Sequence, residues 1–175
     1  PDPKILELQL REQAITDPLT GAYNRRFYIE RLDAEFERFC RSGRTFCLMM
    51  IDFDEFKEVN DNFGHLFGDA VLRQVVSIIK SRLRHNDVLA RVGGEEFSVI
   101  LPDTDIIGAV QLAEDIRKKV STTVIHHEGD KTSITITIGL VEAIENRDSI
   151  DTLMLRADDL LYKGKMSGRD RVYSQ

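Results

Sequence analysis

Two short acidic runs are the features of this sequence best suited to chemistry. Asp52-Phe53-Asp54 ends a continuous apolar segment, and Glu95-Glu96 follows the pair Gly93-Gly94. Carboxylates beside buried strand residues cost free energy unless their charge is compensated, and a hard divalent cation is the usual compensation. Either run alone would be better explained as solvated acids beside a turn. Together they favour a magnesium site on which Asp52 and Glu95 converge, provided that the two segments are neighbouring strands.

The acidic runs belong to a longer, ordered set of motifs that spans the chain from Asp17 to about Tyr173. The set is Asp17-Pro18-Leu19-Thr20-Gly21, Asn24-Arg25-Arg26, Asp52-Phe53-Asp54-Glu55-Phe56-Lys57, Asn60-Asp61, Phe63-Gly64-His65, Gly68-Asp69, Gly93-Gly94-Glu95-Glu96-Phe97, Tyr162-Lys163-Gly164-Lys165 and Gly168-Arg169. With these motifs the chain resembles the GGDEF-family diguanylate cyclase domain, in its Gly-Gly-Glu-Glu-Phe form. The five-residue signature alone is modest, whereas the ordered set is highly specific.

The resemblance implies an enzyme that condenses two GTP molecules into cyclic di-GMP and releases two pyrophosphates. Each 3′-hydroxyl attacks the α-phosphorus of the other GTP, so one domain holds half of the reaction and turnover needs a homodimer. Two Mg²⁺ ions per site, or Mn²⁺ in their place, would activate the nucleophile and neutralise the phosphates. By resemblance, Asp52, the Phe53 carbonyl and Glu95 are the metal ligands. Glu95 is also catalytic, Glu96 assists metal binding or proton removal, and Asp54 supports Asp52 from behind.

The same resemblance assigns the residues that hold the triphosphate. Phe56 and Lys57 occupy a phosphate-cradling turn, where backbone N–H groups and a cation suit the ligand, and Lys57 counts among the catalytic residues. Gly93 and Gly94 would let the backbone approach the α-phosphate. Lys165 and Arg169 match a second pair of phosphate-binding cations. Their alternative explanation is the common preference for basic residues at a helix C-terminus.

Asn60 and Asp69 match the family's guanine-reading pair. A carboxylate accepts hydrogen bonds from guanine N1–H and N2–H₂, while an amide donates to O6 or N3. Adenine would leave that carboxylate facing an acceptor, and such mismatches discriminate strongly. The alternative is that Asn60 and Asp69 are an ordinary turn residue and a helix N-cap; Asp69 could serve as both.

A second ligand site is implied by Arg84-His85-Asn86-Asp87, which ends shortly before Gly93. It matches the family's inhibitory RxxD motif, where cyclic di-GMP binds and restrains the enzyme; an Arg fork and a carboxylate suit the edges of guanine. In isolation, RxxD would usually be an exposed ion pair. The family often adds an Arg from the following helix, but the aligned residue here is Asp115, with Arg117 two positions on, which puts the strength of inhibition in question.

Composition limits the class of protein. The 175 residues carry 24 Lys and Arg against 30 Asp and Glu, a net charge of −6, which argues against a nucleic-acid partner because such surfaces are usually basic. The segment from Lys163 to Arg171 is the local basic exception. The longest apolar run, Phe46 to Ile51, is far too short to cross a membrane. We expect a soluble cytoplasmic domain without membrane contact; a region before residue 1 could still anchor the full-length protein.

The two cysteines and most histidines are expected to be structural. Cys40 and Cys47 form no metal or redox spacing and are typical of core thiols in a reducing compartment. His65 and the pair His126-His127 lack partners at metal-ligand spacing, so we interpret them as structural or surface residues.

Apolar periodicity predicts an α+β fold: a central, mainly antiparallel sheet of about five strands flanked by helices. The family resemblance implies the arrangement of nucleotidyl cyclases and polymerase palms. The expected helices cover approximately 5–15, 24–39, 69–83, 106–120 and 153–161, with a short helix or turn over 56–62. The expected strands are 46–53, 88–92, 97–101, 124–127, 134–141 and an edge strand over 171–173. We divide the chain into a helical stub (1–16), the end of an upstream signalling helix from a sensor or receiver region, and the cyclase domain (17–175).

Two alternatives of other classes remain. A catalytically silent domain could act as a cyclic di-GMP receptor through Arg84 and Asp87, although a pure receptor need not keep Asp52, Lys57 and Glu95 together. A phospho-accepting receiver domain also pairs acids with Lys at strand ends, but it requires alternating parallel βα units. The hairpin signal at Gly93-Gly94 does not fit that pattern.

Overall fold

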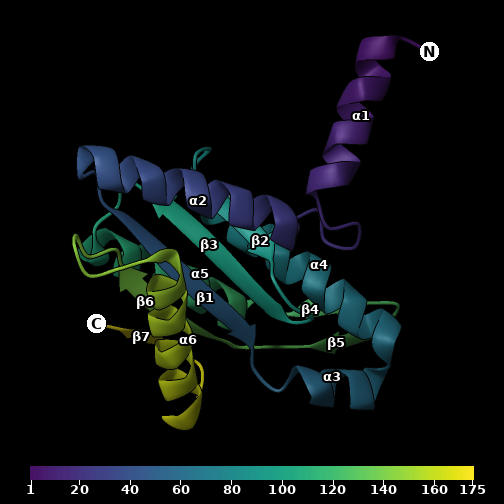
Figure 1. Cartoon of the computed structure of the whole chain (residues 1–175). Coiled ribbons are helices and arrows are strands. Elements are labelled where there is room, and N and C mark those ends of the chain that lie inside the picture. The colour runs from purple at the N-terminus through teal and green to yellow at the C-terminus, as the bar shows by residue number, and fades with distance from the viewer.

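The computed structural model describes all residues, 1–175, as six helices and seven strands (Figure 1). The helices are α1 (Pro3–Ile15), α2 (Arg25–Ser42), α3 (Phe56–Phe63), α4 (His65–Arg82), α5 (Ile106–Thr122) and α6 (Ile150–Met166). The strands are β1 (Phe46–Phe53), β2 (Val88–Arg91), β3 (Glu96–Pro102), β4 (Ile125–His127), β5 (Asp130–Thr132), β6 (Ile136–Glu142) and β7 (Val172–Ser174). None of the helices combines the length and the apolar composition that a bilayer crossing requires.

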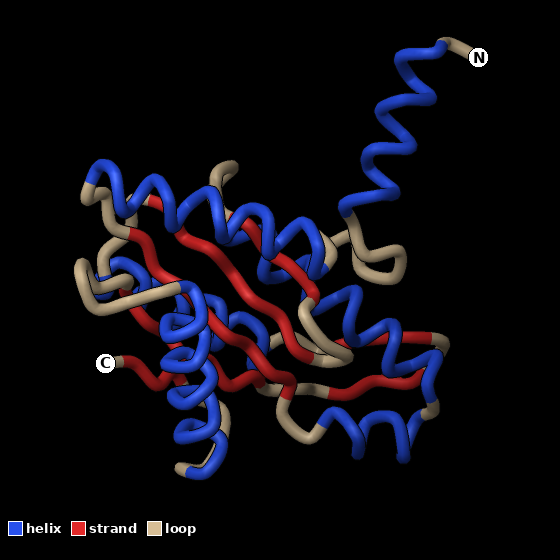
Figure 2. The backbone as a smooth tube through the Cα atoms, in the orientation of Figure 1, coloured by secondary structure: helices blue, strands red, loops and turns tan.

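The central sheet has five strands in the order β2-β3-β1-β6-β7 (Figure 2). Strand β1 is antiparallel to both of its neighbours, β3 and β6, and β2 is antiparallel to β3. The edge strand β7 runs parallel to β6. This mixed, mostly antiparallel sheet confirms the α+β fold expected from the sequence, including the edge strand at the C-terminus.

Strand β1 lies at the centre and separates two cores. Its side chains alternate between the two faces of the sheet. Leu48 and Met50 pack with residues of α2 and α6, whereas Cys47, Met49 and Ile51 pack with residues of α4 and α5. Figure 1 accordingly shows α2 and α6 on one side of the sheet, with α5 on the other. A strand buried on both faces explains why its sequence is continuously apolar rather than alternating.

One close contact fixes α6 on the sheet. A Cβ atom at Gly139 in β6 would lie 2.4 Å from the Ala157 carbonyl oxygen and from the Leu161 nitrogen, so only glycine lets the helix backbone approach the strand. This contact matters for the site because Lys165 lies at the end of α6.

Helix α1 projects away from the body, with the N-terminus at its far end (Figures 1 and 2). None of its residues is buried. Its C-terminal end is held by Asn24, whose backbone N–H donates to the Ile15 carbonyl at 2.8 Å and whose side-chain amide donates to the Ala14 carbonyl at 2.9 Å. Asn24 also caps α2, as predicted, by accepting from the Phe27 N–H.

Three expectations from the sequence are wrong. Helix α4 begins at His65 rather than at Asp69, because Gly64, with φ of 89°, turns the chain directly from α3 into α4. The strand expected over 134–141 begins only at Ile136, as β6, and it is preceded by the short β5, which was not expected and which pairs with β4 in a separate two-stranded sheet. Cys47 is buried as expected, but Cys40 is exposed.

Candidate functional site

The two acidic runs meet at one end of the central sheet. Asp52 in β1 lies opposite Glu96 in β3, and the Phe53 N–H donates to the Glu95 carbonyl at 3.3 Å. The β2–β3 connection is tight, since the Gly93 N–H donates back to the Glu96 carbonyl at 3.1 Å. The prediction that the strands carrying these acids are neighbours is confirmed.

Asp52 is only partly compensated by its surroundings. Burial raises the pKa of Asp52 to about 6; the Lys165 ammonium, 3.6 Å from Oδ2, opposes this rise, and the nearby carboxylates of Glu95 and Glu96 add to it. The other oxygen, Oδ1, is buried without any hydrogen-bond partner. Because a buried carboxylate oxygen needs a donor or a cation, this atom fits a divalent metal ion. No three His, Cys, Asp or Glu side chains gather into a complete metal cage, so such an ion would also need carbonyl, water or phosphate oxygens.

Asp54, two residues on, is saturated with partners. Oδ1 accepts from the Thr137 hydroxyl and the Lys165 ammonium, both at 2.7 Å, and Oδ2 accepts from the Thr135 hydroxyl at 2.7 Å and the Asp170 N–H at 3.0 Å. Burial acts to raise the pKa of Asp54, but these hydrogen bonds, led by that of Lys165, outweigh it and hold the pKa below its usual value. Asp54 therefore anchors the lysine beside Asp52 and has no oxygen left for a metal.

The basic residues near the C-terminus are divided among separate partners. Lys165 is mostly buried and faces the carboxylates of β1. Arg169 lies 3.3 Å from Glu55, at the start of α3, whereas Lys163 pairs with Asp159 on the exposed side of α6. Two cations of the basic segment from Lys163 to Arg171, Lys165 and Arg169, therefore lie beside the acidic runs or α3, whereas Lys163 does not.

The N-terminus of α3 lies directly after β1. Glu55 adopts a left-handed conformation, with φ of 53°, and places no side-chain cap on the helix. The N–H groups of a first helical turn have no intrahelical acceptors, and the helix dipole makes this end partly positive. Phe56 is buried against Phe53, while Lys57 is exposed. This turn thus offers backbone donors and one free ammonium to an anion.

Asn60 is brought next to the residue before Asp69 by the corner between α3 and α4. A Cβ atom at Gly68 would lie 1.9 Å from Asn60 Oδ1, so glycine is required for this approach. Asn60 and Asp69 are both half-buried. Asp69 lies inside α4 rather than at its start, so the alternative interpretation as an N-cap is wrong.

Arg84 and Asp87 form a compact turn between α4 and β2. The Arg84 N–H donates to Asp87 Oδ2 at 2.8 Å, and its guanidinium Nη2 donates to Oδ1 at 3.0 Å. The helix that follows does not supply a further arginine. Asp115 lies 3.5 Å from Arg82, and Arg117 is committed to Glu114 and Asp170.

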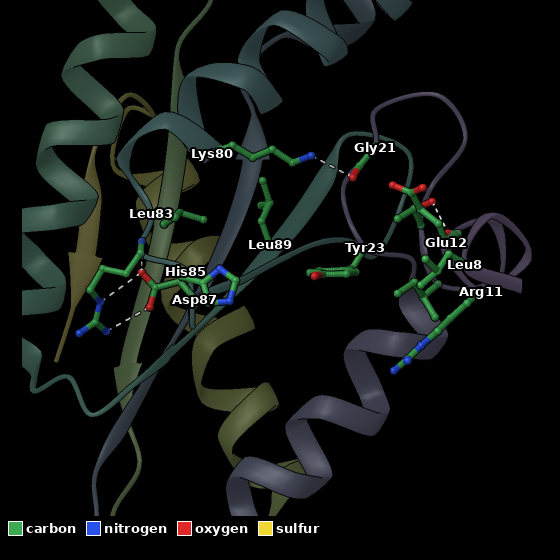
Figure 3. A pocket seen from close by; sticks show the side chains of 13 residues that line it. Leu8, Arg11, Glu12, Gly21, Tyr23, Lys80, Leu83, His85, Asp87 and Leu89 are labelled. Atoms are coloured by element: carbon green, nitrogen blue, oxygen red, sulfur yellow. Dashed lines mark hydrogen bonds and ion pairs between the residues drawn. The ribbon is translucent and has the colours of Figure 1, made fainter. Parts of the chain in front are cut away.

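A cavity of about 670 Å³ lies beside this turn and not at the acidic runs (Figure 3). Its walls come from four places: one face of α1, including Leu8 and Arg11; the loop after α1, including Gly21 and Tyr23; Lys80 and Leu83; and the segment from Arg84 to Leu89. Lys80 crosses it to donate to the Gly21 carbonyl at 2.9 Å. The cavity therefore connects the N-terminal helix with the turn that carries Arg84 and Asp87.

Arg91 was missed in the sequence and has a direct structural link to the Gly93-Gly94 turn. Its Nε donates to the Gly94 carbonyl at 3.0 Å and, more weakly, to that of Gly93 at 3.3 Å. Its Nη1 lies 3.3 Å from both carboxylate oxygens of Asp17, just beyond α1. The only signal in the sequence was that Asp17, the partner of Arg91, begins the motif Asp17-Pro18-Leu19-Thr20-Gly21.

The chain matches known proteins over nearly its whole length. The family model described as "Diguanylate cyclase, GGDEF domain" matches residues 14–171. Diguanylate cyclase DgcP of Pseudomonas aeruginosa is 43% identical over 162 residues, which cover 93% of this chain and 24% of DgcP. Response regulator PleD of Caulobacter vibrioides is 40% identical over 163 residues, covering 92% of this chain and 36% of PleD. The chain thus spans well under half the length of these curated relatives.

A solved structure agrees with the fold. The coiled coil and GGDEF domain of DgcB from Caulobacter crescentus, in complex with c-di-GMP, superposes with a TM-score of 0.93 at 33% identity. The match covers 98% of this chain and 91% of that one. Both the family model and this structure include the strands that carry the acidic runs and the helices around them. The chain therefore belongs to the GGDEF-domain family of diguanylate cyclases.

Proposed function

We propose that this chain is a diguanylate cyclase that condenses two GTP molecules into cyclic di-GMP. The observation that carries the proposal is Asp52 Oδ1, a buried carboxylate oxygen without a partner, beside Glu95 and Glu96. A purely structural acid at this position would be paired, as Asp54 is. Family membership and the identity with DgcP, which is named a diguanylate cyclase, support the same reaction.

In this proposal, Asp52, the Phe53 carbonyl and Glu95 hold the Mg²⁺ ions, with Mn²⁺ as an alternative. When bound, the ions would polarise the α-phosphate and lower the charge repulsion around the triphosphate. The α3 N–H groups, Lys57, Lys165 and Arg169 bind phosphate oxygens and hold the α-phosphorus for attack. The 3′-oxygen of one GTP bonds to the α-phosphorus of the other, and pyrophosphate leaves. Glu96, which is exposed on the same end of the sheet, assists by taking the hydroxyl proton.

The base is selected by Asn60 and Asp69. The glycine-dependent approach of α4 to Asn60 supports this assignment because it fixes the amide close to Asp69. Guanine presents donors to the carboxylate, whereas adenine would leave it unpaired.

Turnover requires two copies of the chain, one GTP in each. Helix α1 supports this part of the proposal, because Ile5, Leu6, Leu8 and Leu10 are 48–65% exposed on an isolated helix. Such apolar residues need a partner in water. We propose that residues 1–16 pair with a second copy and relay a signal from an upstream sensor or receiver region to the catalytic domain, residues 17–175. The matching DgcB structure is described as a coiled coil with its GGDEF domain.

Cyclic di-GMP is proposed to bind at Arg84 and Asp87 and to inhibit the enzyme. An Arg fork and a carboxylate are suited to the edges of guanine. Because Asp115 and Arg82 neutralise each other where a second arginine is expected, we expect weaker inhibition than with two arginines.

The decisive test is incubation of the chain, fused to a dimerising coiled coil, with GTP and Mg²⁺, followed by mass identification of the product. We expect cyclic di-GMP from the wild-type chain and from the control Glu145→Gln, which changes an exposed loop acid, and none from Glu95→Gln. Intact GTP with the wild-type dimer would contradict the proposal. If that protein still bound cyclic di-GMP, and Arg84→Ala did not, the chain would be a receptor instead.

A further inference from the structure

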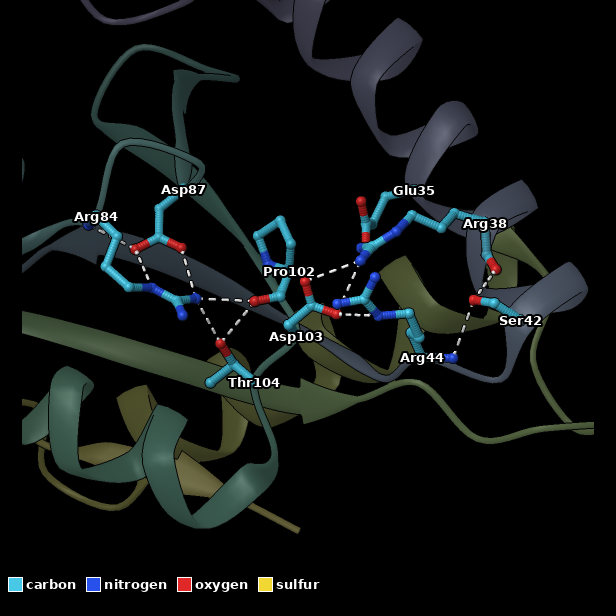
Figure 4. Close-up of polar contacts among 9 residues, drawn as sticks. All are labelled: Glu35, Arg38, Ser42, Arg44, Arg84, Asp87, Pro102, Asp103 and Thr104. Carbon is cyan, nitrogen blue, oxygen red and sulfur yellow. Dashed lines mark hydrogen bonds and ion pairs between the residues drawn. The ribbon is translucent and has the colours of Figure 1, made fainter.

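The Arg84 guanidinium is engaged by several groups of its own chain (Figure 4). Towards Asp87 it donates from Nη2 to Oδ1 at 3.0 Å and, at the longer distance of 3.4 Å, from Nε to Oδ2. In the opposite direction Nη2 lies 2.8 Å from the Pro102 carbonyl and 2.7 Å from the Thr104 hydroxyl oxygen. The same hydroxyl donates to the Pro102 carbonyl at 2.9 Å, which completes a closed set of contacts.

This set occupies the parts of Arg84 that a planar ligand would use. A guanidinium offers two pairs of parallel N–H groups, one from Nε and Nη2 and the other from Nη1 and Nη2. Asp87 takes the first pair. Pro102 and Thr104 share the remaining N–H of Nη2, which removes one member of the second pair. A bidentate ligand must therefore displace either Asp87 or the 102–104 segment.

The Asp87 carboxylate is likewise occupied by contacts within the chain. Its side chain is 0% exposed, and both of its carboxylate oxygens accept from Arg84. A ligand edge cannot reach this carboxylate until the arginine side chain turns away. The Arg84 guanidinium and the Asp87 carboxylate, which are assigned to the product site, therefore become accessible to a ligand only together.

The segment after β3 cannot follow Arg84 when it moves, because it is held from its other side. The Cys47 thiol donates to the Thr104 carbonyl at 3.2 Å. Asp103 accepts two hydrogen bonds from Arg38, at 2.8 and 2.9 Å (Figure 4). The Thr104 hydroxyl is thus a fixed acceptor, and a movement of Arg84 away from this segment breaks the contact.

We propose that Thr104 competes with cyclic di-GMP for Arg84 and so sets the affinity of the product site. This inference rests on the proposed role of Arg84 and Asp87. It adds a residue outside the RxxD motif, and it states the direction of the effect. Removing the hydroxyl should tighten product binding, because the guanidinium then gives up one fewer charge-assisted hydrogen bond.

Calorimetric titration of the chain with cyclic di-GMP tests the proposal. We expect Thr104→Val to lower the dissociation constant roughly three- to tenfold, because Thr104 shares one N–H with the Pro102 carbonyl, so its net contribution is that of an ordinary hydrogen bond. Thr104→Ser keeps the hydroxyl and should bind like the wild type. Thr122→Val, which removes a hydroxyl bonded only to α5 carbonyls, should also leave binding unchanged. Initial rates with GTP, before product accumulates, should be the same in all three variants.

The outcomes separate this inference from the proposed product site. If Arg84→Ala loses binding while Thr104→Val binds as tightly as the wild type or more weakly, the site is real and Thr104 does not compete. If Arg84→Ala binds cyclic di-GMP like the wild type, the product site itself is wrong, and this inference fails with it. Equal tightening by Thr104→Val and Thr122→Val would also overturn it, because the effect would then not depend on the contact with Arg84.

Discussion

The partly buried carboxylate of Asp52 and the buried carboxylate of Asp87 both lie beside a cation, yet they are in opposite states. Asp52 has one oxygen without any partner, and burial raises its pKa to about 6. Asp87 has both oxygens bonded by Arg84 within a single turn. Burial is therefore not what makes a carboxylate ready for a ligand. The number of its hydrogen bonds decides whether a ligand fills an unmet need or must displace an existing partner.

The difference between the two carboxylates follows from how far along the chain each one lies from its cation. Arg84 is three residues from Asp87, so the local turn can close on itself. Lys165 reaches β1 from the end of α6 and is shared between Asp52 and Asp54, with the better contact to Asp54. Asp52 is thereby left to a partner from outside the chain, whereas the Arg84 turn is complete without one.

The largest effect is expected from Asp52→Asn. We expect cyclic di-GMP synthesis to fall at least about 100-fold, because the substitution removes the charge that the metal site requires. The unfolding temperature should be unchanged or higher, because a desolvated negative charge has been removed. Product formation is followed by mass, and stability by circular dichroism on heating. A variant that is both inactive and clearly less stable would mean that Asp52 is a structural acid like Asp87.

Lys165→Met should cost about 2 kcal/mol of stability, because the buried Asp54 carboxylate would lose its paired cation and keep only its neutral hydrogen-bond donors. Urea denaturation measures the change. Lys163→Met, on the same helix turn but paired at the surface with Asp159, is the matched control and should change stability by no more than about 0.5 kcal/mol. Equal effects of the two substitutions would show that Lys165 does not hold the carboxylates of β1.

Asp87→Asn should lower stability by about 1–2 kcal/mol, because the side-chain amide would direct its own N–H groups towards the Arg84 guanidinium. This loss has the opposite sign to the effect on stability expected for Asp52→Asn. Asp115→Asn, in an exposed pair with Arg82, serves as the control and should be nearly neutral. If Asp87→Asn also leaves the stability unchanged, Arg84 and Asp87 do not form these hydrogen bonds in solution.

The sequence was sufficient to place the acidic runs together. A continuous apolar strand ending in Asp52 and a Gly-Gly hairpin before Glu95 imply neighbouring strands, and the structure has them. The start of α4 could not be predicted, because Gly64 turns the chain through backbone conformation and provides no capping side chain. The separate β4–β5 hairpin was also missed, because its second strand has only three residues, all of them polar.

Contacts between side chains that are far apart in the sequence were the main feature that the sequence did not predict. The contact of Arg91 with Asp17 joins residues 74 positions apart, and each residue alone has an ordinary local explanation. The same is true of Lys165, whose partners Asp52 and Asp54 lie more than 100 residues away. Periodicity locates elements, but it contains no information about which cation reaches which acid. The closure of Arg84 by Thr104 belongs to this class too, since nothing in the RxxD spacing includes residue 104.

The smallest effect on stability is expected at Asp148, a hydrogen-bonded carboxylate that belongs to neither site. Burial acts to raise its pKa, but hydrogen bonds from Arg156, the Ile144 N–H and Thr152 outweigh it, so the pKa lies below its usual value. A folded-state pKa below the unfolded value means that the ionised group stabilises the fold at neutral pH. This contribution, less than about 1 kcal/mol, is lost as the pH falls from about 4 through the folded-state pKa. Urea denaturation at pH 7 should therefore show Asp148→Asn to be less stable than the wild type, and the difference should shrink below pH 4. If the stability difference does not depend on pH, the negative charge of Asp148 does not stabilise the fold, and the side chain contributes through packing alone.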